Sequence, residues 1–159
     1  MFDLTPMVRP TMVLASLKNV IVTCNFGALT VDDIRAMNER QARVKEIIGG
    51  APLYALLLIA AGAPAPSHDV RNELSASNPN APNASAVVIE QSSLPIAIVR
   101  SVMATVQFLA PKSMKVDAFR DAESGYAWLI TRATADGASV PPWGEVSLVV
   151  DRVRALRPR

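Results

Sequence analysis

The chain has one cysteine and one histidine among its 159 residues, and this scarcity excludes several kinds of chemistry. A single cysteine, Cys24, cannot form a disulfide within the chain or supply a cysteine-cluster metal site. Because His68 is the only histidine, a metal site built on two histidines is excluded as well. The sequence also contains no GxGxxG or Walker pattern that would bind phosphates. We therefore expect no metal and no cofactor.

Charged and aromatic residues are also scarce, at 19% and 5%, whereas half of the residues are hydrophobic. The core must therefore be mostly aliphatic, and some apolar surface could be covered by a partner. The formal net charge of +2 is too small for the basic stripe that nucleic-acid binding requires, so we expect no nucleic-acid partner. Four arginines fall in the last eight residues. A solvated helix end is the simpler interpretation, and an anionic surface or acidic partner is the alternative.

Neither a membrane span nor a leader sequence is expected. The longest apolar runs are shorter than a comfortable transmembrane helix, and one of them contains Arg100. The first ten residues, MFDLTPMVRP, lack the basic and then apolar layout of a signal peptide. These features predict a cytoplasmic protein.

Short apolar runs alternate with amphipathic stretches, which predicts an α/β fold. We expect strands at residues 11–17, 20–26, 53–61, 86–90 and 114–119, and helices at 30–48, 67–77, 94–110, 121–136 and 145–156. The first two strands form a hairpin and the later ones pair in parallel, so the sheet is mixed, with about five strands flanked by helices. We divide the chain into an α/β domain, 1–137, and a linker plus an extra C-terminal amphipathic helix with an arginine-rich end, 138–159.

The uninterrupted apolar run at 53–61 indicates a central strand covered on both faces. A Gly/Pro/Ala loop follows it and leads to Ser67, His68 and Asp69. Ser67 is placed to cap a helix. Since Ser67 and His68 are adjacent, the serine-to-imidazole hydrogen bond of nucleophilic catalysis is disfavoured. We therefore interpret these three residues as a capped helix start and a candidate recognition surface, and we expect no enzymatic activity.

The helix expected at 94–110 has two apolar rows instead of one. One row can pack on the sheet, and the other needs a second cover. That cover is a neighbouring helix of the same chain, a second copy of the chain or a lipid, and we favour a homodimer over a lipid. The interaction-surface candidates are in this second row, namely Ile96, Val99, Met103 and Val106.

The order of elements, together with the closing segment MKVDAFRDAESGYAWL, resembles the STAS-like domains of the SpoIIAA-like group, also called STAS/SEC14. The segment matches the pattern of a last strand, an acidic cap and a helix through Phe119, Asp121, Ala127, Trp128 and Leu129. The resemblance covers about residues 13–130. It implies a small mixed sheet flanked by helices and a regulatory protein-interaction module.

In the related anti-sigma-factor antagonists, a serine at the start of the helix after the central strand is phosphorylated, which switches partner binding. Ser67 occupies a similar place, in the local sequence APSH instead of an Asp-Ser-type motif. A plain helix cap is the interpretation that we favour for Ser67, with a phosphosite as the alternative.

These observations support two hypotheses of function. The first is a non-enzymatic regulatory protein-interaction module of the STAS-like type, homodimeric, with a protein partner. The alternative is a lipid or small apolar-ligand binding protein of SEC14-like character. It is motivated by the two apolar rows of the helix at 94–110 and by the apolar composition.

Overall fold

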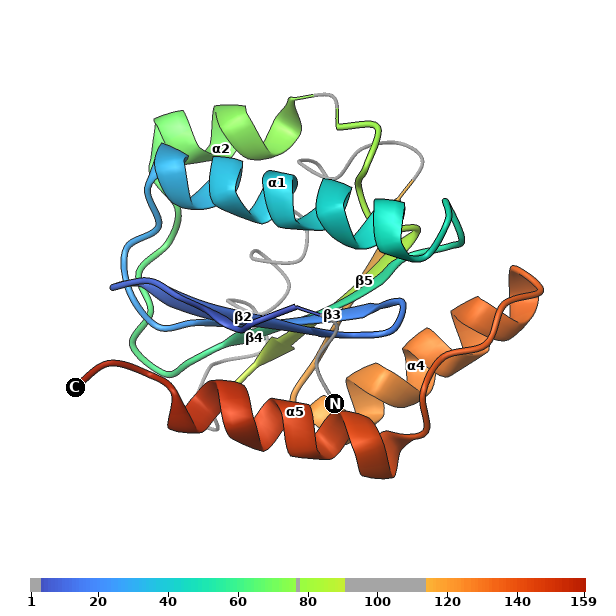
Figure 1. The fold of residues 1–159 in the computed structure, drawn as a ribbon. Coiled ribbons are helices and arrows are strands. Elements are labelled where there is room, and N and C mark those ends of the chain that lie inside the picture. The colour runs from blue at the N-terminus through green and yellow to red at the C-terminus, as the bar shows by residue number, and fades with distance from the viewer. Residues whose placement is uncertain (1–3, 77, 91–113) are drawn as a thin grey trace.

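The computed structural model describes residues 4–76, 78–90 and 114–159 and shows an α/β fold in three layers (Figure 1). A mixed sheet lies in the middle. Helices α1 (Val31–Ile47) and α2 (His68–Ser75) lie on one face, and α4 (Ala122–Ala135) and α5 (Trp143–Ala155) lie on the other (Figure 1). This arrangement confirms the predicted fold class. The helix expected at 94–110 lies outside the described residues.

The sheet has six described strands in the order of the sequence. They are β1 (Met7–Val8), β2 (Met12–Leu17), β3 (Val20–Asn25), β4 (Tyr54–Ile59), β5 (Ala84–Ile89) and β6 (Lys115–Phe119). The strands β1, β2 and β3 pair antiparallel, and β3 to β6 pair in parallel. The predicted hairpin and parallel pairing are confirmed. The count of about five was low because β1 has only two residues, too few to show an alternating pattern.

The start and end signals of α1 act as its sequence predicts. Thr30 is the N-cap, and its hydroxyl and the Asp33 carboxylate form a reciprocal capping box. After the helix, Gly49 and Gly50 adopt φ values of 65° and 78°, which residues with a Cβ rarely adopt. The two glycines thus turn the chain back toward β4.

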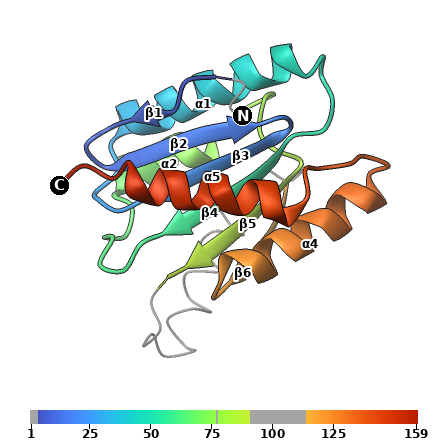
Figure 2. The ribbon, with the colours of Figure 1, turned by 60° about the horizontal axis from the view of Figure 1, so that its bottom comes forward.

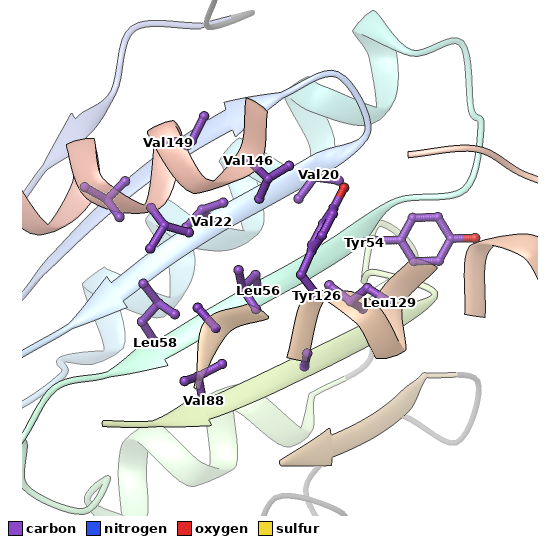
Figure 3. Packing of buried hydrophobic residues seen from close by; sticks show 14 of the residues in the cluster. Val20, Val22, Tyr54, Leu56, Leu58, Val88, Tyr126, Leu129, Val146 and Val149 are labelled. Carbon is purple, nitrogen blue, oxygen red and sulfur yellow. The ribbon is translucent and has the colours of Figure 1, made fainter. Parts of the chain in front are cut away.

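The main hydrophobic core lies between the sheet and the α4/α5 layer (Figure 3). Alternate residues of β3, β4 and β5 meet side chains of both helices there, and Figure 3 labels Val20, Val22, Tyr54, Leu56, Leu58, Val88, Tyr126, Leu129, Val146 and Val149. Close approach of α4 depends on Gly125, since a Cβ there would lie 3.1 Å from Cγ2 of Val88. The two buried tyrosine hydroxyls are satisfied, by the Asp136 carboxylate at 2.7 Å from Tyr54 and by the Pro141 carbonyl at 2.5 Å from Tyr126.

Helix α5 is part of this core. It lies across the near face of the sheet in Figure 2, over β2 and β3. Its inward side consists of four valines, each at most 2% exposed: Val146, Val149, Val150 and Val153. The predicted C-terminal amphipathic helix therefore docks on the sheet of its own chain.

The central strand β4 is covered unequally. Tyr54, Leu56 and Leu58 are fully buried against α4 and α5, whereas the alternate residues are half-buried. The described elements therefore cover one face of β4 more completely than the other; among them, α1 packs over β2 and against α2. Among the described helices, none is both long and apolar enough to cross a membrane.

The docking of α5 predicts a sharp contrast between two neighbouring positions. Val149→Ala removes two buried methyl groups and should lower the free energy of unfolding by about 2 kcal/mol. Leu148→Ala, at a side chain that is 53% exposed, is the matched control and should change it by less than about 0.5 kcal/mol. Urea denaturation of the two variants measures both values. Equal, small effects would mean that α5 does not contribute to the core.

Candidate functional site

The candidate residues follow the central strand at the carboxyl edge of the sheet. The strands β3, β4 and β5 are parallel and end at this edge, and the loop after β4 leads to α2. Open α/β sheets bind ligands at such an edge, in a crevice where the strand order reverses. The order of the six described strands contains no reversal. A ligand at this edge would therefore meet surface loops instead of a crevice of that kind.

Ser67 is the N-cap of α2, as its sequence predicts. Its backbone is extended, with φ −66° and ψ 168°, and its hydroxyl accepts a hydrogen bond from the Val70 N–H at 3.3 Å. Val70 is buried and anchors the first turn. The cap thus holds the start of α2 in place while Ser67 itself stays exposed.

His68 and Asp69 are also exposed and form the first turn of α2. The His68 ring lies one helical turn below Asn72, with Nε2 3.2 Å from the Asn72 amide nitrogen. The described contacts of Ser67 join its hydroxyl to the backbone of Val70 and not to the imidazole. The three residues are therefore side by side but do not form a nucleophile and base pair. What they present is an exposed hydroxyl, imidazole and carboxylate.

The other candidates, Ile96, Val99, Met103 and Val106, lie outside the described residues. Within the described part of the chain, no three residues among His, Cys, Asp and Glu gather closely enough to hold a metal ion.

Cys24 is buried at the end of β3. Burial, and to a lesser degree Glu90, raises the pKa of its thiol, while Arg154 and Arg157 oppose that change. A thiol with a raised pKa stays protonated at neutral pH and is a poor nucleophile. Cys24 is therefore a small core residue rather than a reactive thiol.

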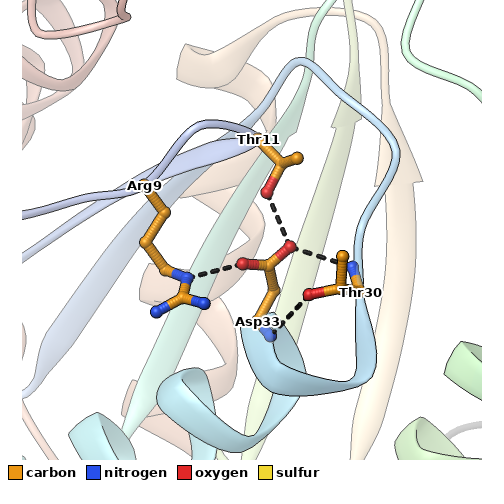
Figure 4. A network of polar contacts seen from close by, with 4 residues as sticks. All are labelled: Arg9, Thr11, Thr30 and Asp33. Atoms are coloured by element: carbon orange, nitrogen blue, oxygen red, sulfur yellow. Dashed lines mark hydrogen bonds and ion pairs between the residues drawn. The ribbon is translucent and has the colours of Figure 1, made fainter.

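A polar network at the start of α1 was only partly foreseen (Figure 4). Asp33 accepts hydrogen bonds from Arg9 Nε at 2.5 Å, the Thr11 hydroxyl at 2.6 Å and the Thr30 N–H at 2.9 Å. Capping explained Asp33 from the sequence, but nothing there indicated Arg9 or Thr11, which are more than twenty residues away. The network ties the turn before β2 to the start of α1.

Asp33 is ionised in this environment. Burial alone would raise the pKa of its carboxyl, but the hydrogen bonds from Thr11, the Thr30 backbone and Arg9 outweigh burial and lower the pKa. Because all three hydrogen bonds to the carboxylate come from within the fold, we assign this cluster a structural role.

Comparisons of the chain with models of protein families, with curated proteins and with solved structures found no match. The resemblance to STAS-like domains therefore stays a prediction.

Removing the Asp33 carboxylate should destabilise the fold. Asp33→Ala removes the carboxylate half of the capping box and leaves Arg9 and Thr11 without their acceptor, so the free energy of unfolding should fall by about 2 kcal/mol. The control Asp32→Ala changes an exposed carboxylate in the same first turn and should cost less than about 0.5 kcal/mol. Urea denaturation at pH 7 distinguishes the two.

The same carboxylate gives a pH signature. Folding lowers the pKa of Asp33. Its contribution to the free energy of unfolding is therefore complete above the ordinary aspartate pKa of about 3.9 and is lost as the pH falls through the lowered pKa. The stability difference between wild type and Asp33→Asn should therefore shrink at acid pH. A difference that stays constant from pH 7 to pH 2 would contradict the assigned network.

Proposed function

We propose that the chain is a non-enzymatic, regulatory protein-interaction module of STAS-like type that acts in the cytoplasm and binds a protein partner through the surface around Ser67, His68 and Asp69. The observation that carries this proposal is the exposure of every residue from 64 to 69 at the carboxyl edge of the sheet. A surface that projects from a packed sheet is suited to contact with another protein.

The chemistry of this loop favours recognition over catalysis. Pro64 and Pro66 restrict the backbone of the loop, which lowers the entropy lost when a partner orders it. Ser67, His68 and Asp69 are exposed to water, whereas a catalytic site gains its strength from a preorganised, water-excluded environment.

Ser67 is the residue at which this contact could be switched. A phosphate on its hydroxyl would stand at the N-terminus of α2, where the helix dipole and free N–H groups stabilise negative charge. It would also replace a neutral hydroxyl beside Asp69 with about two negative charges, which changes what the partner meets.

The test is capture of cytoplasmic proteins with wild type, Ser67→Asp, Ser67→Ala and the control Ser75→Asp, which adds the same charge at the other end of α2. Aspartate caps a helix as well as serine does, so Ser67→Asp should keep the stability of the wild type. We expect Ser67→Asp to change at least one captured protein relative to wild type, and Ser75→Asp to leave that protein unchanged. Identical capture by all four proteins would contradict the proposal.

A homodimer is a second proposal, and it rests on Val99 and Met103 in the segment outside the described residues. Native mass spectrometry should show a species of twice 17.0 kDa at micromolar concentration, and Val99→Asp or Met103→Asp should convert it to the monomer. A monomer in all three samples would contradict it.

The alternative function, binding of a lipid or a small apolar ligand, rests on the same segment. None of the described contacts favours it. The same spectra distinguish it, because a copurified lipid would appear as added mass on the monomer.

A further inference from the structure

A second feature at the carboxyl edge of the sheet is the arginine-rich end of α5. The helix ends at Ala155, and the chain continues over the end of β3 (Figure 2). There the guanidinium carbon of Arg157 lies 4.9 Å from the centre of the Phe26 ring. Arg154 lies beside the end of β5, with Nε 3.0 Å from Oε1 of Glu90. Two arginines are thus brought together at one edge by residues distant in the sequence.

The contact with Phe26 holds Arg157 without using its hydrogen-bond donors. A guanidinium that stacks on a ring is attracted through its flat face, while its five N–H groups point outward in its own plane. Among the described residues, no carboxylate lies within ion-pair distance of Arg157, which is exposed. Arg157 is therefore a preorganised donor of hydrogen bonds to an anionic group.

Arg154, unlike Arg157, already has carboxylate partners within the fold. Its Nε and one terminal nitrogen both approach the same oxygen of Glu90, and its other terminal nitrogen is 3.9 Å from Asp151. Its side chain is nevertheless 42% exposed. Glu90 thus holds Arg154 in position and at the same time competes for it with any incoming carboxylate.

We propose that Arg154 and Arg157 bind carboxylate groups of an acidic segment of a partner protein. Residues 152–159 contain four arginines and no acidic residue, and Glu90 and Asp151 offset part of this positive charge at Arg154. The proposal rests on a different observation from the role of Ser67, and either can fail without the other.

The surroundings favour an acidic protein segment over other anionic partners. A helix that lies on a membrane inserts an apolar face, but the apolar face of α5 is buried in the core. Nucleic acid needs a longer basic stripe than these few arginines and a net charge of +2 provide. A peptide with several carboxylates can pair with both guanidinium groups at once.

The direct test is fluorescence anisotropy of a labelled octaglutamate peptide at low salt. Arg157→Gln should weaken binding about fivefold. Phe26→Leu leaves the charge unchanged and should weaken it about two- to fivefold, because Arg157 loses its support. The control Arg35→Gln removes the same charge from α1, where Arg35 pairs with Glu73 at 3.4 Å, and should change the affinity less than either.

Two glutamate variants test the proposal through an increase in peptide affinity instead of a decrease. Glu90→Gln removes the competitor of Arg154 and should strengthen peptide binding, whereas Glu73→Gln makes the same charge change beside Arg35 and should not. The proposal would be overturned if Glu90→Gln and Glu73→Gln had equal effects, or if Arg157→Gln and Arg35→Gln did. Either result would mean that the affinity depends on net charge alone. The proposal would also be overturned if phosphatidylserine vesicles, inorganic phosphate or single-stranded DNA bound with the same dependence on Arg157 while the peptide did not.

Discussion

The burial of one face of the sheet beneath α4 and α5 is the interaction on which the rest of the structure depends. Side chains from β2 to β5 and from both helices form one continuous apolar cluster. A fully buried valine side chain contributes about 1.5–3 kcal/mol, and α5 alone brings four of them. Because this packing fixes α5, it also fixes where the chain ends. Arg154 and Arg157 therefore reach the ends of β5 and β3 instead of hanging free in solvent.

The opposite layer is held by polar contacts as well as by apolar ones. A small second cluster that includes Leu14, Ile21 and Val44 lies under α1. The Asp33 network joins the start of the same helix to the turn before β2 (Figure 4). In the proposed function, the carboxyl edge of this anchored sheet presents its loops to a partner. The order of the six described strands has no reversal, so recognition there would depend on exposed side chains.

Much of this fold could be predicted from the sequence, because its signals are local. The hairpin, the Thr30 capping box, the Ser67 and Asp121 caps and the buried row of α4 all follow from periodicity and capping rules. Ile47 shows the limit of periodicity, since helical spacing predicts it on the same side of α1 as Ile34 and Val44, yet it is 45% exposed. On a helical wheel, the buried side of α1 extends from Ile34 through the polar Gln41 to Val44. Ile47 lies beyond Val44, outside this buried side.

The surroundings of the carboxyl edge were harder to predict than the start of α2, because the contacts of Arg154 and Arg157 join distant residues. The cap at Ser67 was local and was found. The contact of Arg157 with Phe26 joins residues 131 positions apart, and the pairing of Arg154 with Glu90 joins residues 64 positions apart; no sequence pattern indicates either. The four terminal arginines could be seen, but their position at the sheet edge follows only from the docking of α5.

The claim that α5 belongs to the core, and so places the arginines, is tested most directly by native-state hydrogen exchange. If it is right, amides in the middle of α5 exchange only through the global unfolding that also exposes β3, β4 and β5, with the same free energy and the same dependence on denaturant. Exchange of the α5 amides through a separate opening of much lower free energy, while the strands stay protected, would contradict it.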